Sequence, residues 1–447
     1  MGLQQIIFLL LIGISGYFGF KRYGAVKRNI FLGKDEDISD NKGQRLKNVF
    51  LVALGQKKMF KRFIPAILHF FIYAAFLMTQ IELIEIILDG ISGKHRIFAN
   101  GLGGFYTFLI SFIEILSVLA FVATIIFLWR RNMLKLPRFH KPEMNGWPKL
   151  DGNLILYGEI LLLIGIFTMN GTDTLLQQID PAHYPDTGNL AISSWLGPAL
   201  FGGLGESSLH FLERAGWWLH LLVILGFIYY LPISKHLHIF LAFPNVYFAK
   251  LRSRGEMENM PVIMDEVKSM MGLIPEKEVD PNEELPEFGS KDIFDLSWKN
   301  ILDAYTCTEC GRCTSVCPAN ITGKKLSPRK VMMDIRDRAE EVGKVLDANS
   351  EKTKENYDDG KSLFDYISKE ELHACTTCNA CVEACPVMID PLEPILKLRR
   401  YEILTESAGP AEWVPMFTAI ENGGAVWQIP DARDKWAQEF NQDLEVE

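Results

Sequence analysis

Five long apolar stretches in the first 250 residues restrict this chain to few folds. They lie near residues 3–20, 63–88, 104–129, 152–169 and 216–243. Each approaches the roughly 20 residues of helix that cross a bilayer core about 30 Å thick. Every backbone N–H and C=O inside that core needs an internal partner, so an apolar segment of this length forms a helix. The sequence therefore predicts a bundle of five transmembrane helices.

The basic residues of the loops predict how the helices are oriented. Lysine and arginine total twelve in residues 21–62, two in 89–103, six in 130–150 and one in 170–215. Basic loops stay on the cytoplasmic side of a membrane. We therefore expect the N-terminus outside and all residues after 244 in the cytoplasm. Residues 1–5 carry no basic side chain, so the first stretch is expected to remain as an anchor rather than to be a cleaved signal peptide.

Composition agrees with a membrane protein that has a soluble part. The chain has 447 residues, of which 48% are hydrophobic, with a mean hydropathy of +0.09 and a net charge of −9. It has no basic stripe outside the short loops, so no nucleic-acid partner is expected. The membrane lipid is the first expected partner, and the bacterial cytoplasmic membrane is the expected location.

All eight cysteines fall in two short runs with the same spacing. The runs follow the pattern C-x2-C-x2-C-x3-C-P, which is typical of bacterial ferredoxins that bind [4Fe–4S] clusters. Their members are Cys307, Cys310, Cys313 and Cys317, then Cys375, Cys378, Cys381 and Cys385. Zinc sites usually pair two shorter C-x2-4-C steps around one metal, which would leave the third spacing and the proline unexplained.

The fourth cysteine of each run is expected to bind the cluster of the other run, as in two-cluster ferredoxins. The first cluster is thus assigned to Cys307, Cys310, Cys313 and Cys385. The second is assigned to Cys375, Cys378, Cys381 and Cys317. Thiolates suit iron, and free thiols suit the reducing side of a membrane.

The soluble half is expected to be helical, because no alternating strand pattern accompanies either cysteine run. A helix is expected to begin after Ser327, with Pro328 in its first turn. The full prediction is all-α, with a transmembrane cytochrome b-like domain at 1–250 and a two-cluster ferredoxin domain at 288–406. An acidic linker at 251–287 joins them, and a partner-docking tail follows at 407–447. The outer loop at 170–215 is expected to be a structured cap or loop rather than a helix pair.

Three histidines of the apolar half are candidate haem or quinone ligands. His69 lies in the cytoplasmic half of the second stretch, and His238 lies at matching depth in the fifth. Two histidines on facing helices at one depth are what bis-histidine ligation of haem b requires. His220 precedes His238 by five helical turns, on the same face and nearer the outer surface, and is a candidate for a second haem or a quinone. His236 is expected on nearly the opposite face, and an interfacial role for His236 or His238 is the alternative.

Four carboxylates also fall within apolar stretches, namely Glu82, Glu85, Glu114 and Glu159. Ionisable groups inside a membrane are costly and commonly functional. They could bind a quinone or relay its protons, and Glu159 lies at the depth of His69. Hydrogen bonds between helices are the alternative.

Parts of the chain resemble known families. GQKKMFKRFIPAILHF and WWLHLLVILGFIYYLPISKHLHIFLAFPN resemble the membrane domain of nitrate reductase gamma subunits and of heterodisulfide reductase membrane subunits. FGSKDIFDLSWKNILDAYTCTECGRCTSVCPAN, TTCNACVEACPVMIDP and KLRRYEIL resemble the iron–sulfur subunit of the heterodisulfide reductase type. The resemblance implies haem b on the second and fifth helices, at His69 and at His238 or His220. Gamma subunits have two histidines on the second helix, whereas this chain has one.

These features predict an oxidoreductase subunit that passes electrons between a soluble partner and menaquinone, through two [4Fe–4S] clusters and haem b. The resemblance favours electron-transfer flavoprotein as donor. The sequence has no CCG signature and no ninth cysteine, so the substrate-converting subunit, a flavoprotein or a CCG-domain protein, is expected on a separate chain. The alternatives are a heterodisulfide or thiol reductase complex, and a membrane anchor without haem.

Overall fold

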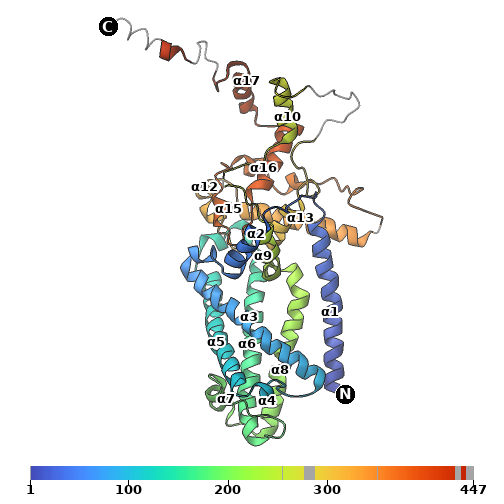
Figure 1. The fold of residues 1–447 in the computed structure, drawn as a ribbon, viewed down its shortest axis with the longest axis vertical. Coiled ribbons are helices and arrows are strands. Elements are labelled where there is room, and N and C mark those ends of the chain that lie inside the picture. The colour runs from blue at the N-terminus through green and yellow to red at the C-terminus, as the bar shows by residue number, and fades with distance from the viewer. Residues whose placement is uncertain (1, 254, 276–286, 350, 428–433, 439–447) are drawn as a thin grey trace, which may run out of the picture. The chain divides into compact units, whose positions relative to one another are not determined.

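The computed structural model describes residues 2–253, 255–275, 287–349, 351–427 and 434–438 (Figure 1). Over these residues the fold is helical and contains no strand, and Lys34 and Ser297 form an isolated β-bridge. The chain divides into two compact units. One unit comprises Met1–Asn259 with Asp292–Ile395, and the other comprises Met260–Lys291 with Leu396–Glu447.

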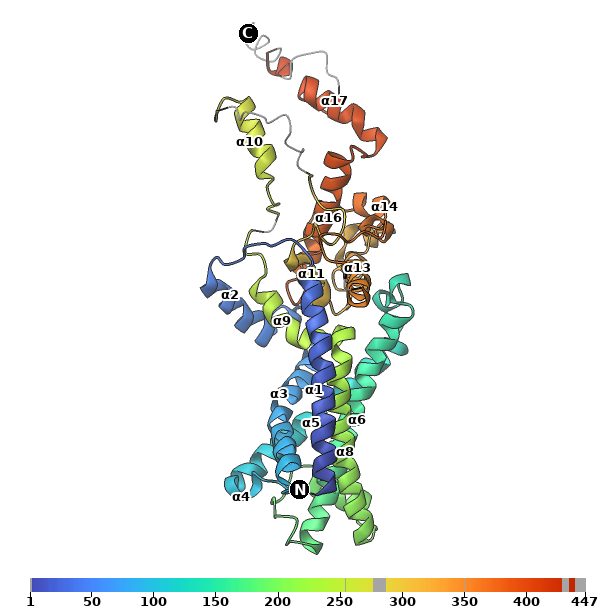
Figure 2. The same cartoon turned by 90° about the vertical axis from the view of Figure 1, so that its right-hand side faces the viewer.

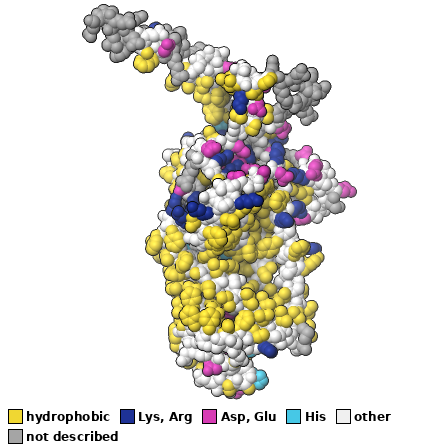
Figure 3. All heavy atoms as spheres, viewed as in Figure 1, with side chains coloured by type: hydrophobic (Ala, Val, Ile, Leu, Met, Phe, Trp, Pro, Cys, Tyr) yellow, Lys and Arg dark blue, Asp and Glu magenta, His cyan; other side chains and the backbone are white. Residues whose placement is uncertain are grey.

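Five helices of the first unit are long and apolar enough to cross a membrane (Figures 1 and 2). They are α1 (Leu3–Ile30), α3 (Phe63–Ser92), α5 (Gly104–Asn132), α6 (Trp147–Ile179) and α8 (Glu206–Tyr230). Hydrophobic side chains cover their visible outer surface, and charged side chains gather beyond their ends (Figure 3). The predicted five-helix bundle is therefore confirmed.

Aromatic and aliphatic side chains from four helices pack together in the interior of the bundle. Phe8, Ile86, Met169 and Trp217 belong to one buried cluster drawn from α1, α3, α6 and α8. The most extensive helix–helix contact joins α6 to α8.

Glycine allows this contact between α6 and α8 to be close. A β-carbon on Gly216 would lie 2.7 Å from the carbonyl oxygen of Gly165. Small residues at such crossings let two backbones approach in a membrane, where packing rather than the hydrophobic effect drives association.

Beyond one end of the bundle, three short helices pack on one another, two of them in the segment that joins α1 to α3. They are α2 (Lys42–Asn48), the π-helix Val49–Leu54 and α9 (His238–Tyr247). In the cysteine-containing region, α9 packs on α11 (Trp298–Thr306), which packs on α13 (Pro328–Ala348). The end of α1 also reaches α11 and α13, where Asn29 Nδ2 donates to Tyr305 Oη at 2.9 Å. Ser327 caps α13 as predicted, because its hydroxyl accepts from the N–H of Lys330.

The remaining short helices of the first unit connect or cap these elements. They are α4 (Ala99–Leu102), α7 (Ser193–Phe201), α12 (Pro318–Ile321), α14 (Lys369–His373) and α15 (Ala380–Ala384), together with the 3₁₀ turns Met59–Lys61, Pro137–Phe139, Pro142–Met144, Leu231–Ile233, Lys235–Leu237, Thr314–Val316 and Leu363–Asp365.

The second unit contains α10 (Pro261–Met270), the end of α16 (Leu392–Arg400), the π-helix Tyr401–Thr405, the 3₁₀ turn Ala411–Trp413 and α17 (Val414–Gly423). The N–H of Ser290 donates to the carbonyl of Lys397 at 3.0 Å, and the hydroxyl of Thr405 bonds the backbone of Phe288. Part of the predicted linker is thus helical, and residues 276–286 of it lie outside the described part of the chain.

The outer segment at 170–215 differs from its prediction. Helix α6 continues to Ile179, α7 spans Ser193–Phe201, and α8 begins at Glu206. Polar residues in this part of α6 are buried rather than exposed, with Asn170 at 1% and Asp173 at 0%. Their polarity suggested a loop, but each has a buried partner, so the helix persists.

Candidate functional site

The two cysteine runs share an unusual backbone conformation. In the first run Glu309 and Gly311 have φ of +53° and +68°, on either side of Cys310. In the second run Thr377 and Asn379 have φ of +54° and +59°, on either side of Cys378. The left-handed region costs about 1–2 kcal/mol for a residue with a side chain. Both runs therefore fold into the same tight loop, as two sites for the same kind of ligand would.

The second set of cysteines surrounds one cavity. Cys375, Cys378 and Cys381 line it together with Cys317 from the first run, and apolar side chains such as Leu326 complete the wall. Cys378 is exposed, whereas Cys317 and Cys381 are buried. The donor set fits a [4Fe–4S] cluster, because four thiol groups from the two runs line one largely apolar cavity, and Cys378 lies at the surface.

In the first set Cys307 and Cys385 are buried and Cys310 and Cys313 are partly buried, so none of the four is exposed. Burial raises the pKa of Cys385 to about 11, with the nearby charge of Cys310 adding to the effect. Burial likewise raises the pKa of Cys307 to about 12, and Cys310 and Cys385 contribute. The structure thus brings Cys385 to the first run. Buried thiols of this kind ionise only beside a compensating cation, which cluster iron would supply.

Backbone N–H groups point at the sulfurs of both sets. The N–H of Thr377 lies 3.4 Å from Cys375 Sγ, and the N–H of Ile389 lies 3.3 Å from Cys385 Sγ. Hydrogen bonds to cluster sulfur are one of the means by which a protein sets the potential of a cluster.

Two of the predicted haem ligands lie side by side. The ring centroids of His69 and His238 are 6.5 Å apart, with a 42° angle between the ring planes. Bonds between imidazole and metal are about 2 Å long, and a ring centre lies about 1 Å beyond its nitrogen, so two imidazoles on opposite sides of one iron have centres about 6 Å apart. The separation of the two histidines fits bis-histidine ligation.

The second nitrogen of each ring is already occupied. Nδ1 of His69 lies 3.1 Å from Oε1 of Gln56, and Nδ1 of His238 lies 3.0 Å from the carbonyl oxygen of Lys235. Carbonyl oxygens only accept, so Nδ1 carries the proton in each ring and the lone pair of Nε2 remains for a metal. Metal-bound histidines typically have this arrangement.

The structure corrects the helix on which His238 was placed. Helix α8 ends at Tyr230, a 3₁₀ turn containing Pro232 follows, and Ser234 is extended with φ −115° and ψ 148°. His238 therefore begins α9, and helical periodicity from His220 does not apply to it. The proline in LPISKHLH was the signal for this break.

His236 joins this pair of histidines, although the sequence analysis placed it on another face. Its ring lies 5.7 Å from that of His238, and its buried Nδ1 has no hydrogen-bond partner within the described residues. Burial, with the like charges of His238 and His69, lowers the pKa of His236 to about 3. Its imidazole is thus neutral and is a third potential metal ligand.

His220 lies apart from the other three histidines. It is buried at the contact of α8 with α6, where its Nδ1 is 3.0 Å from the carbonyl oxygen of Leu162. The free Nε2 leaves a role as a ligand open, but the structure does not bring a second histidine to it within the described region.

Three of the four intramembrane carboxylates bind nearby polar groups. Glu85 accepts from Tyr106 Oη at 2.6 Å, Glu82 faces Arg96 at 3.8 Å, and Glu114 accepts from the N–H of Ile192 at 2.8 Å. These contacts hold the outer segments in place. Within the described part of the chain, Glu159 accepts one hydrogen bond, from Thr124 Oγ1 at 3.2 Å.

A cavity lies where the start of α1, the end of α3 and the first half of α8 meet. Its lining includes Gln5, His95, Tyr184, Arg214 and Trp218. Local sequence pattern does not reveal it, because its residues come from segments that are far apart in the chain.

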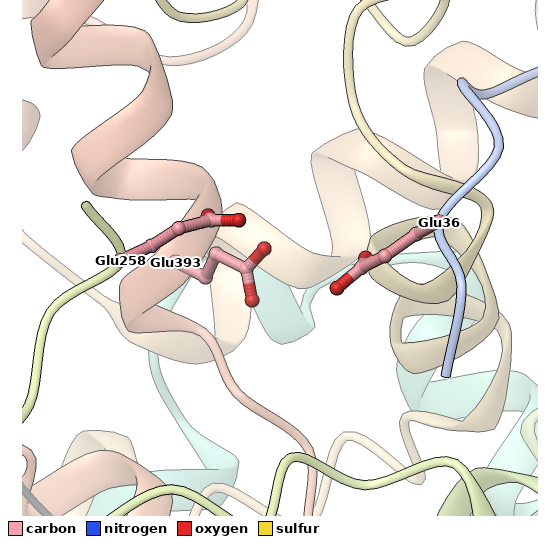
Figure 4. A group of neighbouring side chains, drawn as sticks. All are labelled: Glu36, Glu258 and Glu393. Atoms are coloured by element: carbon pink, nitrogen blue, oxygen red, sulfur yellow. The ribbon is translucent and has the colours of Figure 1, made fainter. Parts of the chain in front are cut away.

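An acidic trio lies on the first unit, where Glu36, Glu258 and Glu393 point toward one another (Figure 4). Lys250 sits among them, with its Nζ 3.2 Å from Glu36 and 2.6 Å from Glu393. The ammonium group therefore provides the positive charge that an ion would otherwise supply.

The cysteine-containing region matches a known protein family. Residues 306–389 match the 4Fe-4S dicluster domain. The prediction of two [4Fe–4S] clusters and of an all-helical chain with a two-cluster ferredoxin domain is thereby confirmed.

Longer matches extend to the membrane helices. Over 98% of its length the chain is 28% identical to the probable iron-sulfur-binding oxidoreductase FadF of Bacillus subtilis, and it covers 61% of that protein. Over 97% it is 26% identical to the EtfAB:quinone oxidoreductase of Syntrophomonas wolfei, and it covers 59% of that protein. A probable membrane-anchored ferredoxin of Chromohalobacter salexigens is 32% identical over 33% of the chain, which covers 24% of that protein.

The chain thus spans about three-fifths of the length of the first two relatives. No solved structure matches it. The first two relatives are thus named as oxidoreductases, and the five helices indicate a chain with several membrane passes.

Proposed function

We propose that this chain is the membrane electron-transfer part of a quinone-linked oxidoreductase. Electrons would pass between a soluble redox partner and the quinone pool through two [4Fe–4S] clusters and haem b. When bound, these groups supply one-electron chemistry, and the protein sets their positions and potentials. The fusion of a cytochrome b-like bundle with a ferredoxin domain is part of this proposal.

The order of the three sites carries the proposal. The second cysteine set reaches the surface at Cys378, whereas no cysteine of the first set is exposed. The electrostatic field of Arg312 reaches both Cys310 of the first set and His69. A soluble partner would therefore meet the second set, and the first set lies between it and the histidines.

The side chain of Arg312 links the first cysteine run to the start of α3. Its Nη1 donates to the carbonyl of Met59 at 3.2 Å, a few residues before α3 begins. Arg312 therefore binds the loop that leads to His69. We assign Cys307, Cys310, Cys313 and Cys385 to the first cluster, Cys317, Cys375, Cys378 and Cys381 to the second, and His69 and His238 to haem b.

At the quinone end of the relay we assign Glu159, which accepts a hydrogen bond from Thr124. Its carboxylate would exchange protons with quinone, since quinone reduction takes up protons. The name of the Syntrophomonas relative supports a quinone acceptor and a flavoprotein donor. We place the substrate-converting centre outside residues 1–447, and menaquinone is the quinone we propose.

Spectroscopy of the purified protein tests the haem assignment. The wild-type protein should show a dithionite-reducible b-type α-band, and His69→Ala and His238→Ala should each lose it, because one axial ligand is missing. His183→Ala is the matched control, since the His183 side chain is 78% exposed on the outer side of the bundle. A wild-type spectrum without the band would refute haem b. Retention of the band in His238→Ala but not in His236→Ala would reassign the ligand.

A further inference from the structure

Lys235 is a buried lysine located between the membrane helices and the first cysteine run. Its side chain is 8% exposed. Its Nζ donates to the carbonyl of Pro148 at 2.6 Å, and its N–H donates to Asp151 Oδ2 at 3.0 Å. Because α6 begins at Trp147, both contacts fix Lys235 to the start of a membrane helix.

The Nζ of Lys235 also binds the first cysteine run. It forms an ion pair with Oε2 of Glu309, which lies between Cys307 and Cys310 and has a left-handed backbone. The other carboxylate oxygen of Glu309 accepts from Arg336 Nη1 at 2.9 Å. Glu309 is 2% exposed, so its charge is held between two cations away from water.

The backbone of Lys235 reaches the histidine pair. Its carbonyl oxygen lies 3.0 Å from Nδ1 of His238. One residue thus contacts the loop of the first cluster through its ammonium group and the imidazole of His238 through its carbonyl. Hydrogen bonds to the second nitrogen of a metal-bound imidazole fix its orientation and raise its basicity.

We propose that Lys235 is a positioning residue that couples the first cluster to the haem. It holds the cysteine loop and the His238 ring in a fixed relation, and it places a positive charge between the two electron carriers. This inference rests on the proposed function, because it takes His238 as a haem ligand and Cys310 as a cluster ligand.

A buried ion pair does not by itself require a functional role, since apolar residues of the same volume often replace such pairs without loss of stability. A coupling role requires in addition that the midpoint potential of the haem changes when the lysine is removed. A positive charge near an electron carrier favours its reduced state. Its removal should therefore lower the midpoint potential of the haem and of the first cluster.

The test is a potentiometric titration of purified wild-type, Lys235→Met and Lys235→Arg proteins, following the haem α-band and the cluster EPR signals. We expect a lower haem midpoint and altered low-spin g-values in Lys235→Met, with Lys235→Arg closer to wild type. Lys299→Met is the matched control, because Lys299 is 2% exposed and pairs with Asp303 at 2.6 Å and with Asn245 at 3.0 Å.

Equal haem midpoints and g-values in wild type and Lys235→Met would overturn the inference, and so would an equal shift in Lys299→Met. If Lys235→Met fails to hold its cofactors, Glu309→Gln takes its place, since it keeps the lysine and weakens the ion pairs of Glu309 with Lys235 and Arg336. An unchanged first-cluster midpoint in Glu309→Gln would overturn the coupling. Absence of haem from the wild-type protein would refute the proposed function and this inference together, whereas a normal haem with no response to Lys235 refutes the inference alone.

Discussion

Thr377 is the residue whose backbone is least compatible with its side chain. It is β-branched, yet its φ is +54°, and such residues are rare in the left-handed region. The equivalent position of the first run is Glu309, and glycine stands at neither. The strain is stored beside the ligands, which is where functional sites commonly hold it.

Thr377→Gly should therefore stabilise the ferredoxin domain by up to about 1.5 kcal/mol. The substitution removes about 1–2 kcal/mol of backbone strain. It also costs about 0.5–1 kcal/mol of stability, because glycine has greater conformational freedom in the unfolded chain. The N–H that faces Cys375 Sγ is retained. Chemical denaturation followed by cluster absorbance measures the change.

Thr376→Gly is the control for this prediction, because Thr376 is not among the residues with positive φ. It should destabilise the domain by up to about 1 kcal/mol. A Thr377→Gly protein that loses its clusters at lower denaturant concentration than Thr376→Gly would contradict the strain argument.

At the scale of elements, the hydropathy of the sequence predicted which segments cross the membrane but not where the helices end. Helix α1 was expected to stop near residue 20 and continues to Ile30, and α6 was expected to stop near 169 and continues to Ile179. Both extensions carry polar residues whose partners are distant in sequence, such as Asn29 with Tyr305 and Asn170 with Arg96. Local pattern cannot reveal such partners.

The contact of α6 with α8 gives a prediction at the same scale. Gly216→Leu should destabilise the bundle by about 3 kcal/mol or more, at the upper end of overpacking costs, because the new side chain would meet the backbone of Gly165 and Met169. Gly226→Leu on the same helix should have little effect, since nothing lies within 4 Å of its added β-carbon. Thermal unfolding in detergent compares the two, and equal midpoints would disprove the close crossing.

For the molecule as a whole, the cysteine spacing alone was enough to predict two [4Fe–4S] clusters, because each loop is local. The histidine site was less predictable. The depth argument predicted that His69 and His238 lie close together, and their rings are neighbours in the structure, whereas their role as haem ligands stays a prediction. The argument missed His236 and the turn at Pro232 that brings His236 to the pair. The contacts of Arg312 with Met59 and of Glu309 with Lys235 could not have been predicted from the sequence. They depend on how the cysteine-containing region packs on the membrane helices.

Orientation in the membrane remains a prediction, and it can be tested on the whole protein. An epitope inserted between Gly203 and Leu204, before α8, should bind antibody on intact spheroplasts. The same epitope inserted after Glu355, an exposed residue between the cysteine runs, should bind only after permeabilisation. The reason is the excess of lysine and arginine in residues 21–62 and 130–150, which favours the cytoplasmic side. The reverse pattern of labelling would refute the assigned orientation.

The position of α9 has a consequence for how the protein is assembled. His238 begins this helix, which packs on α11, and Asn245 Nδ2 within it donates to the carbonyl of Val387 just after the second cysteine run. One half of the histidine pair is thus held by the iron–sulfur region and the other half by α3. The pair therefore depends on segments as far along the chain as Val387. If it holds the proposed haem, haem capture would follow the synthesis and folding of the iron–sulfur region.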